Sequence, residues 1–274
     1  MNILSKIVLF LVIFLPACGG GDTNNASTKA ANSEPTINAY NGYWKGTLAS
    51  SQYGHIGETH LIVDEEGNAY LYYAYTAGNT KTFIKYYAAK GKIDSDQFIP
   101  DIVYSDNASS SYIPSLIWNK INTTFQFNFE LSTNDIISGT YRKDHEVITD
   151  YGDVMLFHQE LSNQTFPVSV YSNNYEVLYG SYDTSYVYIG IGIDDEGNIS
   201  GSYTQKFNYS IVDEVPIIGK ATLLESNMYD IEINLGNRSF SGRGVSIGGV
   251  LHFITIQDDN SDFALISISR NGSL

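Results

Sequence analysis

Ser246 lies in the segment Gly244-Val245-Ser246-Ile247-Gly248, which matches the G-x-S-x-G pattern of a nucleophilic serine. That pattern works only on a strand-to-helix turn that exposes the serine hydroxyl. Here residues 250–253 follow, and their composition is that of another strand. His252 lies six residues after Ser246, but nothing in the sequence pairs it with an orienting acid. We therefore expect a strand here and no catalytic residue.

A second segment places His55, Glu58 and His60 close together. On a strand, Glu58 and His60 would share one face, and a transition metal could use them as ligands. His55 has the opposite parity, so it could join them only from a loop or a bulge. A polar strand edge explains the same residues, and we predict no metal site and no cofactor.

Two acidic segments, Asp64-Glu65-Glu66-Gly67-Asn68 and Asp194-Asp195-Glu196-Gly197-Asn198, could suggest calcium. An EF-hand loop needs oxygen ligands at alternate positions and a glutamate at its twelfth position. Neither segment has that pattern. A hairpin turn fits better, because Asp starts such turns and Gly takes the left-handed position. With no coherent catalytic set, we predict that the protein is not an enzyme.

The elements around these residues have the pattern of β-strands. Apolar residues alternate with polar ones from Phe125 to Leu131 and from Tyr229 to Leu235, the period of strands with one buried face. Residues 250–256 and 263–268 are nearly continuous apolar runs, typical of strands that are buried on both sides or close a barrel. Short strands between Gly, Asn and Asp clusters predict an all-β sandwich or barrel.

The two halves of this β-rich region share several segments in the same order. The acidic turns match each other, as do two Gly-Lys pairs, two alternating strands, two Ser-Gly pairs and two Gly-initiated apolar runs. The matched segments are 62–68 with 191–199, 91–92 with 219–220, 125–129 with 229–233, 138–139 with 241–242, and 152–157 with 248–253. We predict two tandem, similar antiparallel β-barrel or sandwich units, although chance matches between two β-rich halves could produce the same list.

The chain begins with Lys6 and an apolar stretch from Ile7 to Phe14, which is too short to span a bilayer and indicates a targeting segment. Leu15-Pro16-Ala17-Cys18 follows and contains the only cysteine of the chain. This segment resembles a bacterial lipobox, which implies lipidation of Cys18 as the first mature residue. Gly19 follows where inner-membrane lipoproteins typically carry Asp, so the resemblance implies anchoring in the outer membrane, on either side.

The charge of the chain excludes one class of partner. Removing residues 1–17 takes away Lys6 and no acidic residue, so 14 basic and 30 acidic side chains remain, a formal charge of −16. Binding to phosphate requires Lys and Arg, so we predict no nucleic-acid partner. The 22 tyrosines favour strands, and they also suit a rigid, amphipathic contact surface.

We divide the chain into four parts. Residues 1–17 are the predicted lipoprotein signal peptide, and residues 18–38 are the lipidated cysteine with a Gly-, Asn- and Ser-rich flexible tether. Residues 39–165 and 166–274 are the two predicted β-units. Because no cysteine follows Cys18, no disulfide within the mature chain can stabilise them.

Gly42-Tyr43-Trp44-Lys45-Gly46 at the start of the first unit is similar to the first strand of lipocalin-like barrels. The second unit, with Gly197–Gly201 and Ser241-Gly242, resembles a repeat of uncharacterised bacterial envelope lipoproteins. We expect a non-enzymatic protein-binding lipoprotein, either a surface receptor or adhesin, or a periplasmic immunity or inhibitor protein. The alternative is a lipocalin-like carrier of a small apolar ligand, which an interior filled by Phe125, Phe127, Phe129, Tyr229 and Ile231 would exclude.

The binding surface is expected beside a polar loop of the first unit. Residues 105–111 are rich in Ser and Asn, and loops of this kind often carry binding residues. Tyr112 and Trp118 follow this loop, and they are our candidate binding residues.

Overall fold

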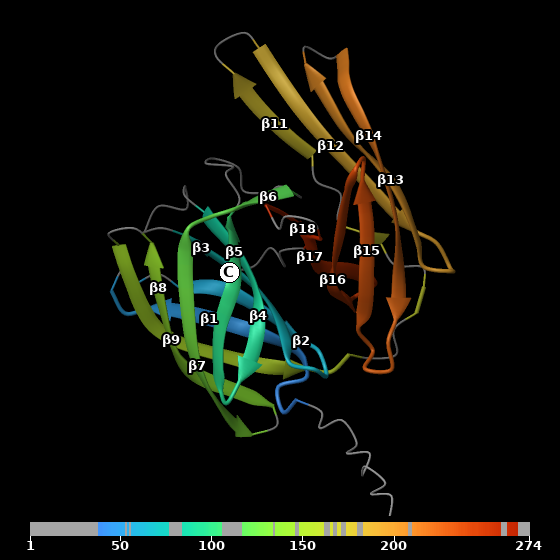
Figure 1. Ribbon diagram of the computed structural model, residues 1–274. Helices are drawn as coiled ribbons and strands as arrows, with labels where there is room; N and C mark the ends of the chain where they lie inside the picture. Colours follow the sequence, from blue (N-terminus) through green and yellow to red (C-terminus); the bar gives the residue numbers. More distant parts are fainter. Residues whose placement is uncertain are drawn as a thin grey trace, which may run out of the picture. The chain divides into compact units, whose positions relative to one another are not determined.

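The protein is all-β in the computed structural model (Figure 1). The structure describes residues 38–52, 54, 56–76, 84–105, 117–133, 135–145, 148–161, 165–166, 169–170, 174–179, 183–207, 210–258 and 262–267. These residues contain eighteen strands and belong to one compact unit, Ile37–Leu274. Within this described part, no helix is long and apolar enough to cross a membrane. The predicted all-β class is confirmed.

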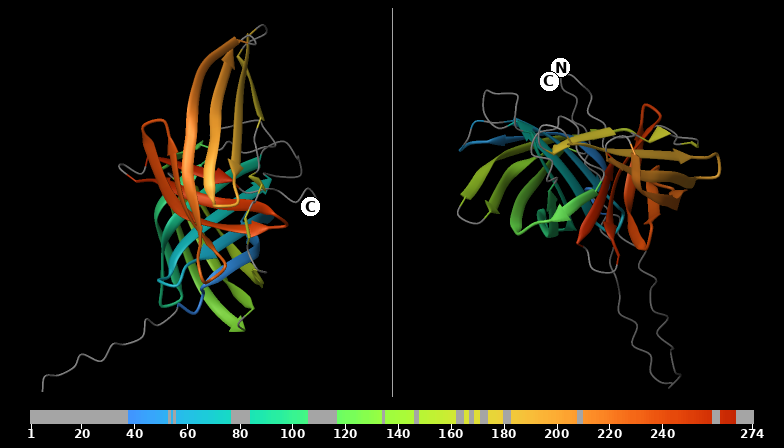
Figure 2. Two further views of the ribbon diagram at one scale, coloured as in Figure 1. Left: turned by 90° about the vertical axis from the view of Figure 1, so that its right-hand side faces the viewer. Right: turned by 90° about the horizontal axis from the view of Figure 1, so that it is seen from above.

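Eight strands of the first half close an antiparallel barrel. They are β1 (Gly42–Ser50), β2 (Ile56–Val63), β3 (Asn68–Thr76), β4 (Ile84–Asp94), β5 (Gln97–Ser105), β7 (Thr123–Thr133), β8 (Ile136–His145) and β9 (Ile148–Gln159). Each strand pairs antiparallel with the next, and β9 pairs with β1 from Tyr43↔Gln159 to Ser50↔Gly152. Figure 2 shows these strands from two further sides, coloured blue to yellow-green.

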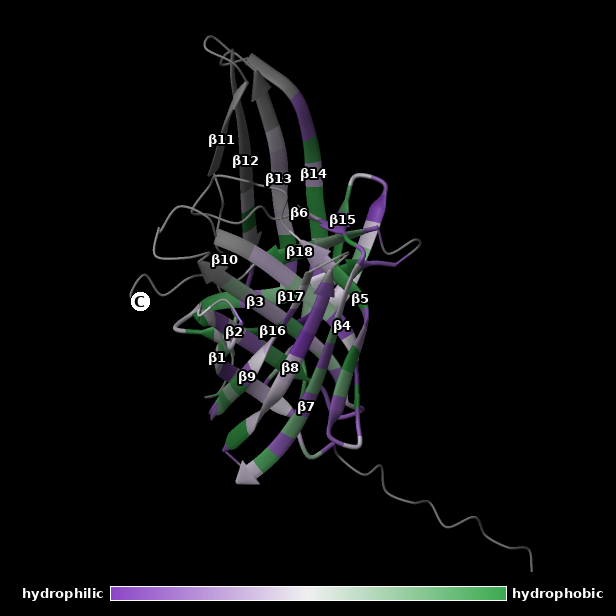
Figure 3. Cartoon of the chain, turned by 90° about the vertical axis from the view of Figure 1, so that its left-hand side faces the viewer, coloured by the Kyte–Doolittle hydropathy of each residue, from purple (hydrophilic) through white to green (hydrophobic). Residues whose placement is uncertain are grey.

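The barrel interior is filled with aromatic side chains. Along β7 the burial alternates strictly, with Phe125, Phe127 and Phe129 inside and Gln126 and Asn128 exposed. Figure 3 shows the same alternation as hydrophobic and hydrophilic bands along this strand. The Phe125 and Phe127 rings stack with centroids 5.6 Å apart, within the preferred range for aromatic pairs. The period-two prediction for this segment is confirmed.

The two acidic segments are hairpin turns of the same construction. In each turn the first Asp donates its N–H to the Asn carbonyl, at 3.0 Å for Asp64 and 3.1 Å for Asp194. Gly67 and Gly197 both have φ +82°, a left-handed conformation that favours glycine. The hairpin-turn interpretation of both segments is confirmed.

The second half forms a further set of strands. They are β10 (Ser169–Val170), β11 (Asn174–Tyr179), β12 (Asp183–Ile193), β13 (Asn198–Phe207), β14 (Ser210–Leu223), β15 (Tyr229–Leu235), β16 (Arg238–Ile247), β17 (Val250–Gln257) and β18 (Phe263–Ser267). From β11 to β18 each strand pairs antiparallel with the next. The apolar alternation from Tyr229 to Leu235 is confirmed, with every second residue buried.

The short strand β10 closes a second ring of strands, and this ring has an odd number of strands. It pairs antiparallel with β12 and parallel with β17, so the path from β10 through β12–β17 returns to β10 through seven strands. In an up-and-down arrangement an even number of strands closes antiparallel, whereas an odd number requires one parallel pair. By the matched segments, β14 corresponds to β4 and β15 corresponds to β7. The second ring therefore has no strand that corresponds to β5. This missing strand explains the parallel closure.

The two halves share one continuous hydrogen-bonded sheet. The strand β6 (Ile117–Lys120) pairs with β5 of the barrel and with β18 of the second half. The boundary between two units near residue 165 therefore stays a prediction.

A tyrosine-rich outer face of the barrel is covered by the second half. Buried residues from both halves form one contiguous cluster, which we call the seam. The barrel contributes mainly Tyr43, Ile62, Tyr70, Tyr72, Tyr86, Tyr104 and, on β6, Trp118; the second half contributes Met228, Val245, Ile254, Ile256, Ala264 and Ile266. Much of the tyrosine content thus serves intramolecular packing, because half-polar rings can cover a sheet face while their hydroxyls find partners.

Candidate functional site

The predicted site residues lie in different environments. Trp118 is fully buried in the seam, with its ring centroid 5.9 Å from that of Tyr72 and 6.1 Å from that of Tyr86. Its indole is therefore a packing element and not part of an exposed surface. Tyr112, Cys18 and His55 lie outside the described residues.

The segment containing Ser246 is a strand, as the sequence predicts. Gly244, Val245 and Ser246 belong to β16, and the hairpin returns directly into β17 with Val245 opposite His252. A nucleophile elbow requires a helix after the serine, and β17 occupies that place.

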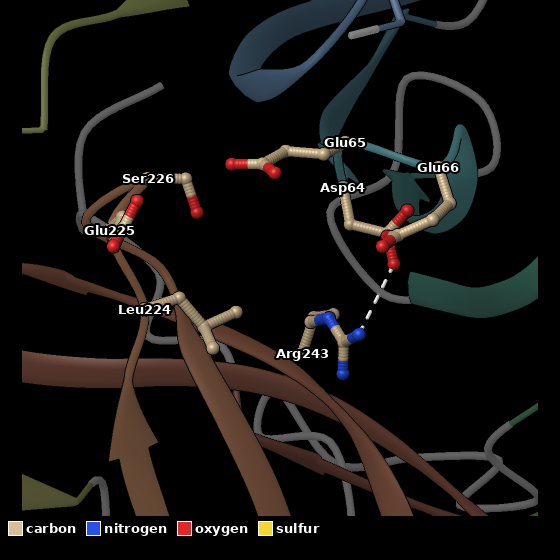
Figure 4. A pocket seen from close by; sticks show the side chains of 7 residues that line it. All are labelled: Asp64, Glu65, Glu66, Leu224, Glu225, Ser226 and Arg243. Atoms are coloured by element: carbon tan, nitrogen blue, oxygen red, sulfur yellow. Dashed lines mark ion pairs between the residues drawn. The ribbon is translucent and has the colours of Figure 1, made fainter. Parts of the chain in front are cut away.

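A cleft of about 260 Å³ lies between the first acidic turn and the turn that follows β14 (Figure 4). Its lining residues are Asp64, Glu65, Glu66, Leu224, Glu225, Ser226 and Arg243. Arg243 forms ion pairs with Asp64, at 3.3 Å, and with Asp230. Carboxylates outnumber the single guanidinium, so the cleft suits a cationic group better than an anion.

A polar cluster lies inside the barrel. The carboxylate of Asp150, which is fully buried, accepts hydrogen bonds from Ser50 Oγ at 2.6 Å and from Tyr141 OH at 3.1 Å. Lys143 Nζ lies 3.8 Å from the same carboxylate and 5.0 Å from the Tyr87 ring centroid. Burial and the nearby carboxylate raise the pKa of Tyr141. These groups satisfy one another, which is how a buried charge becomes tolerable.

A chain of hydrogen bonds runs along the outer face of the barrel at the seam. Tyr43 OH lies 2.6 Å from His60 Nδ1, His60 Nε2 lies 3.1 Å from Glu58 Oε1, and Lys45 Nζ lies 2.9 Å from the same oxygen. Glu58 and His60 share a face, as predicted, but they bind each other and Lys45. Among the described residues, no group of three or more His, Cys, Asp and Glu side chains could hold a metal ion.

The pKa values of the side chains in this series of hydrogen bonds follow from burial and from the hydrogen bonds themselves. Burial lowers the pKa of His60, so the imidazole is neutral at pH 7. Burial opposes ionisation of Glu58, but hydrogen bonds from His60 and Lys45 outweigh it and lower the Glu58 pKa to about 2. Glu58 and Lys45 therefore carry opposite charges beside a neutral histidine.

Large apolar side chains are exposed on the outer face of β9. Tyr151, Met155 and Phe157 are 53%, 49% and 45% exposed, and together we call them the β9 stripe. They share one face with the exposed Asp153, because strand side chains alternate, and Val154 and Leu156 are buried in the barrel. Ile136 of β8 lies directly opposite Phe157 and extends this apolar surface.

No protein-family model, curated protein or solved structure matches the chain. Its function must therefore be argued from its own geometry.

The β9 stripe was not predicted as a functional surface. Residues 154–157 are a continuous apolar run, and the matched residues 250–253 begin the nearly continuous apolar run 250–256 of the second half. In β17 that pattern is buried on both sides, by the second sheet and by the seam. In β9 only the inner side is buried. The signal available in the sequence was therefore the apolar outward positions Met155 and Phe157.

Proposed function

We propose that the chain is a lipid-anchored outer-membrane lipoprotein that binds another protein and performs no chemistry itself. The observation that carries this proposal is the β9 stripe, three large apolar side chains exposed on one barrel strand. Clustered exposed apolar surface is characteristic of interaction sites, whereas single exposed apolar residues are ordinary. Tyr and Met are also enriched at protein interfaces, where their flat or flexible side chains fit a partner.

The comparison with β17 supports the same conclusion. A strand with apolar residues on both faces is stable when both faces are covered. The seam covers β17, and a partner protein would cover β9 in the same way. Lipid anchoring at Cys18 would keep this surface at the membrane where an envelope partner resides.

The alternative, a carrier of a small apolar ligand, receives less support. Phe125, Phe127, Phe129, Tyr229 and Ile231 are all buried, each at most 4% exposed. Stacked aromatic rings occupy the barrel interior where a lipocalin-like ligand would bind. A filled interior favours recognition on the outside of the barrel.

The decisive experiment replaces the β9 stripe by serine. The triple variant Tyr151→Ser, Met155→Ser, Phe157→Ser should lose a specific envelope or secreted partner that wild-type protein captures. The matched control replaces Ile56, Ile99 and Ile218, which are 58%, 54% and 58% exposed on other strands, and should retain the partner. Equal capture by both triple variants would contradict the proposal, and a co-purified lipid without any protein partner would favour the carrier.

Anchoring has its own test. Cys18→Ala should release the protein from outer-membrane fractions or leave an unprocessed precursor. A substituted protein that still fractionates with outer membrane at wild-type size would contradict lipidation at Cys18. Protease treatment of intact cells would then separate a surface receptor, which is cleaved, from a periplasmic inhibitor, which is protected.

A further inference from the structure

Two histidines face each other across the seam. His60 on β2 and His252 on β17 have ring centroids 6.4 Å apart and an interplanar angle of 18°. Their exposed fractions are 2% and 4%. They come from the two halves of the chain, so the stack holds the barrel and the second sheet together at this point.

The hydrogen bonds of His60 suit a neutral ring. Tyr43 OH can donate to Nδ1 while Nε2–H donates to Glu58, so both ring nitrogens are satisfied in one tautomer. A proton added to Nδ1 would reverse this hydrogen bond, because the Tyr43 oxygen can accept from Nδ1–H, and the hydroxyl proton would lose its acceptor in a buried site.

The groups around the stack come from four neighbouring strands. Tyr43 and Lys45 face it from β1, Glu58 from β2 beside His60, and the Tyr72 ring lies edge-on to His60 from β3 with centroids 5.4 Å apart. On the β17 side, the pKa of His252 is lowered to about 4. Burial is the largest cause, followed by the nearby His60 and Lys45, whereas Glu58 acts in the opposite direction. Since Lys45 already neutralises Glu58, a further positive charge here has no full counter-charge.

We propose that the His60–His252 stack is a proton-sensitive latch, which holds β17 on the barrel at neutral pH and loosens the seam in a mildly acidic medium. The closed stack is most stable while both rings are neutral, because burial opposes a charge on either imidazole and two charged imidazoles would also repel each other. Once the seam opens, water reaches both rings and protonation becomes favourable. Acid therefore favours the open state, while the barrel strands away from the seam stay paired.

The expected size of the effect follows from His252. Its pKa falls from 6.5 to about 4 in the closed seam. Each pKa unit of difference is a tenfold change in equilibrium, so at about pH 5 the open state should gain roughly 30-fold over neutral pH. That change is large enough for hydrogen exchange to detect.

Hydrogen exchange on the purified protein tests this latch. Rates for amides of β17 and β2 are compared at about pH 7.5 and about pH 5 after correction for intrinsic exchange, with amides of β7 and β8 as the internal reference. Wild-type protein should lose protection at the seam by about 30-fold in acid, and the amides of β7 and β8 should stay better protected than those of the seam at both pH values. His252→Gln should reduce this change, and the His60→Gln, His252→Gln double variant should abolish it. The control His158→Gln, on β9 beside Trp44, should preserve it.

Two results would overturn the latch. One is wild-type protection at the seam that is independent of pH in this range, and the other is an acid response that persists in the His60→Gln, His252→Gln double variant. If these variants fail to fold, the imidazole resonances of wild-type protein provide the readout. Two histidines that titrate far below 6.5 support the proposal, and titration of all histidines near 6.5 refutes it.

Discussion

Asp150 lies fully buried inside the barrel, with Ser50, Tyr141 and Lys143 around its carboxylate. Asp150→Ala would leave the Lys143 ammonium buried without its counter-charge, and breaking a buried pair costs about 3–5 kcal/mol. Asp144→Ala removes a carboxylate from an exposed pair with Arg142, which water and salt screen, and should cost much less. Urea unfolding of both variants measures the difference, and similar losses would show that Asp150 is not compensated as described.

His252 also makes the stability of the whole protein depend on pH. Its pKa in the folded state is about 4 and its unfolded value is 6.5, so between these values the unfolded chain binds more protons. Stability is therefore complete above pH 6.5 and falls as pH decreases, by about 2 kcal/mol at about pH 5. Urea titrations across this range should show the loss in wild-type protein and a flatter profile in His252→Gln. Identical profiles would place the pH dependence elsewhere.

At the scale of the element, the two acidic hairpins differ in how tightly they are packed. A Cβ at Gly67 would first meet the side-chain nitrogen of Asn38, at 2.5 Å, whereas one at Gly197 would meet the backbone oxygen of Ala221 at 2.3 Å. A side chain can move aside and a paired strand cannot. We expect Gly197→Ala to cost more than Gly67→Ala, since both share the left-handed φ penalty of about 1 kcal/mol and only the former overlaps a backbone atom that cannot move aside, which adds about 1–3 kcal/mol.

Gly249→Ala measures the penalty of the left-handed backbone conformation alone, in the same series of unfolding experiments. Gly249 has φ +78° and no atom within 4 Å of an added Cβ. Its variant should lose about 1 kcal/mol, with thermal or urea unfolding as the measurement. A loss at Gly249 equal to that at Gly197 would mean that packing against Ala221 contributes nothing.

At the scale of the whole molecule, the seam makes the first half dependent on the second. A chain ending at residue 165 would expose the seam face of the barrel, including Tyr43, Ile62, Tyr70 and Tyr72, all at most 4% exposed in the intact protein. Exposed apolar surface of this size promotes association. We expect this truncated chain to self-associate and bind a hydrophobic dye, as measured by light scattering and fluorescence. A monomer without dye binding would mean that the barrel is independent of its cover.

Local sequence patterns were sufficient for the strands and the turns. The alternation from Phe125 to Leu131 requires one buried face in any antiparallel sheet, and Asp-x-x-Gly-Asn requires a left-handed glycine in any hairpin. These features depend on neighbours within a few residues, which is why the sequence alone determined them.

Only the tertiary structure decided which outer faces are covered. Residues 154–157 are a continuous apolar run and residues 250–256 are a nearly continuous one, yet Met155 and Phe157 are exposed while Ile254 and Ile256 are buried in the seam. Trp118 likewise follows a polar loop in the sequence but packs between the halves. Strand periodicity sets which residues share a face. The strands that pack over that face lie about 200 residues away along the chain. Local sequence carries no information about such a contact.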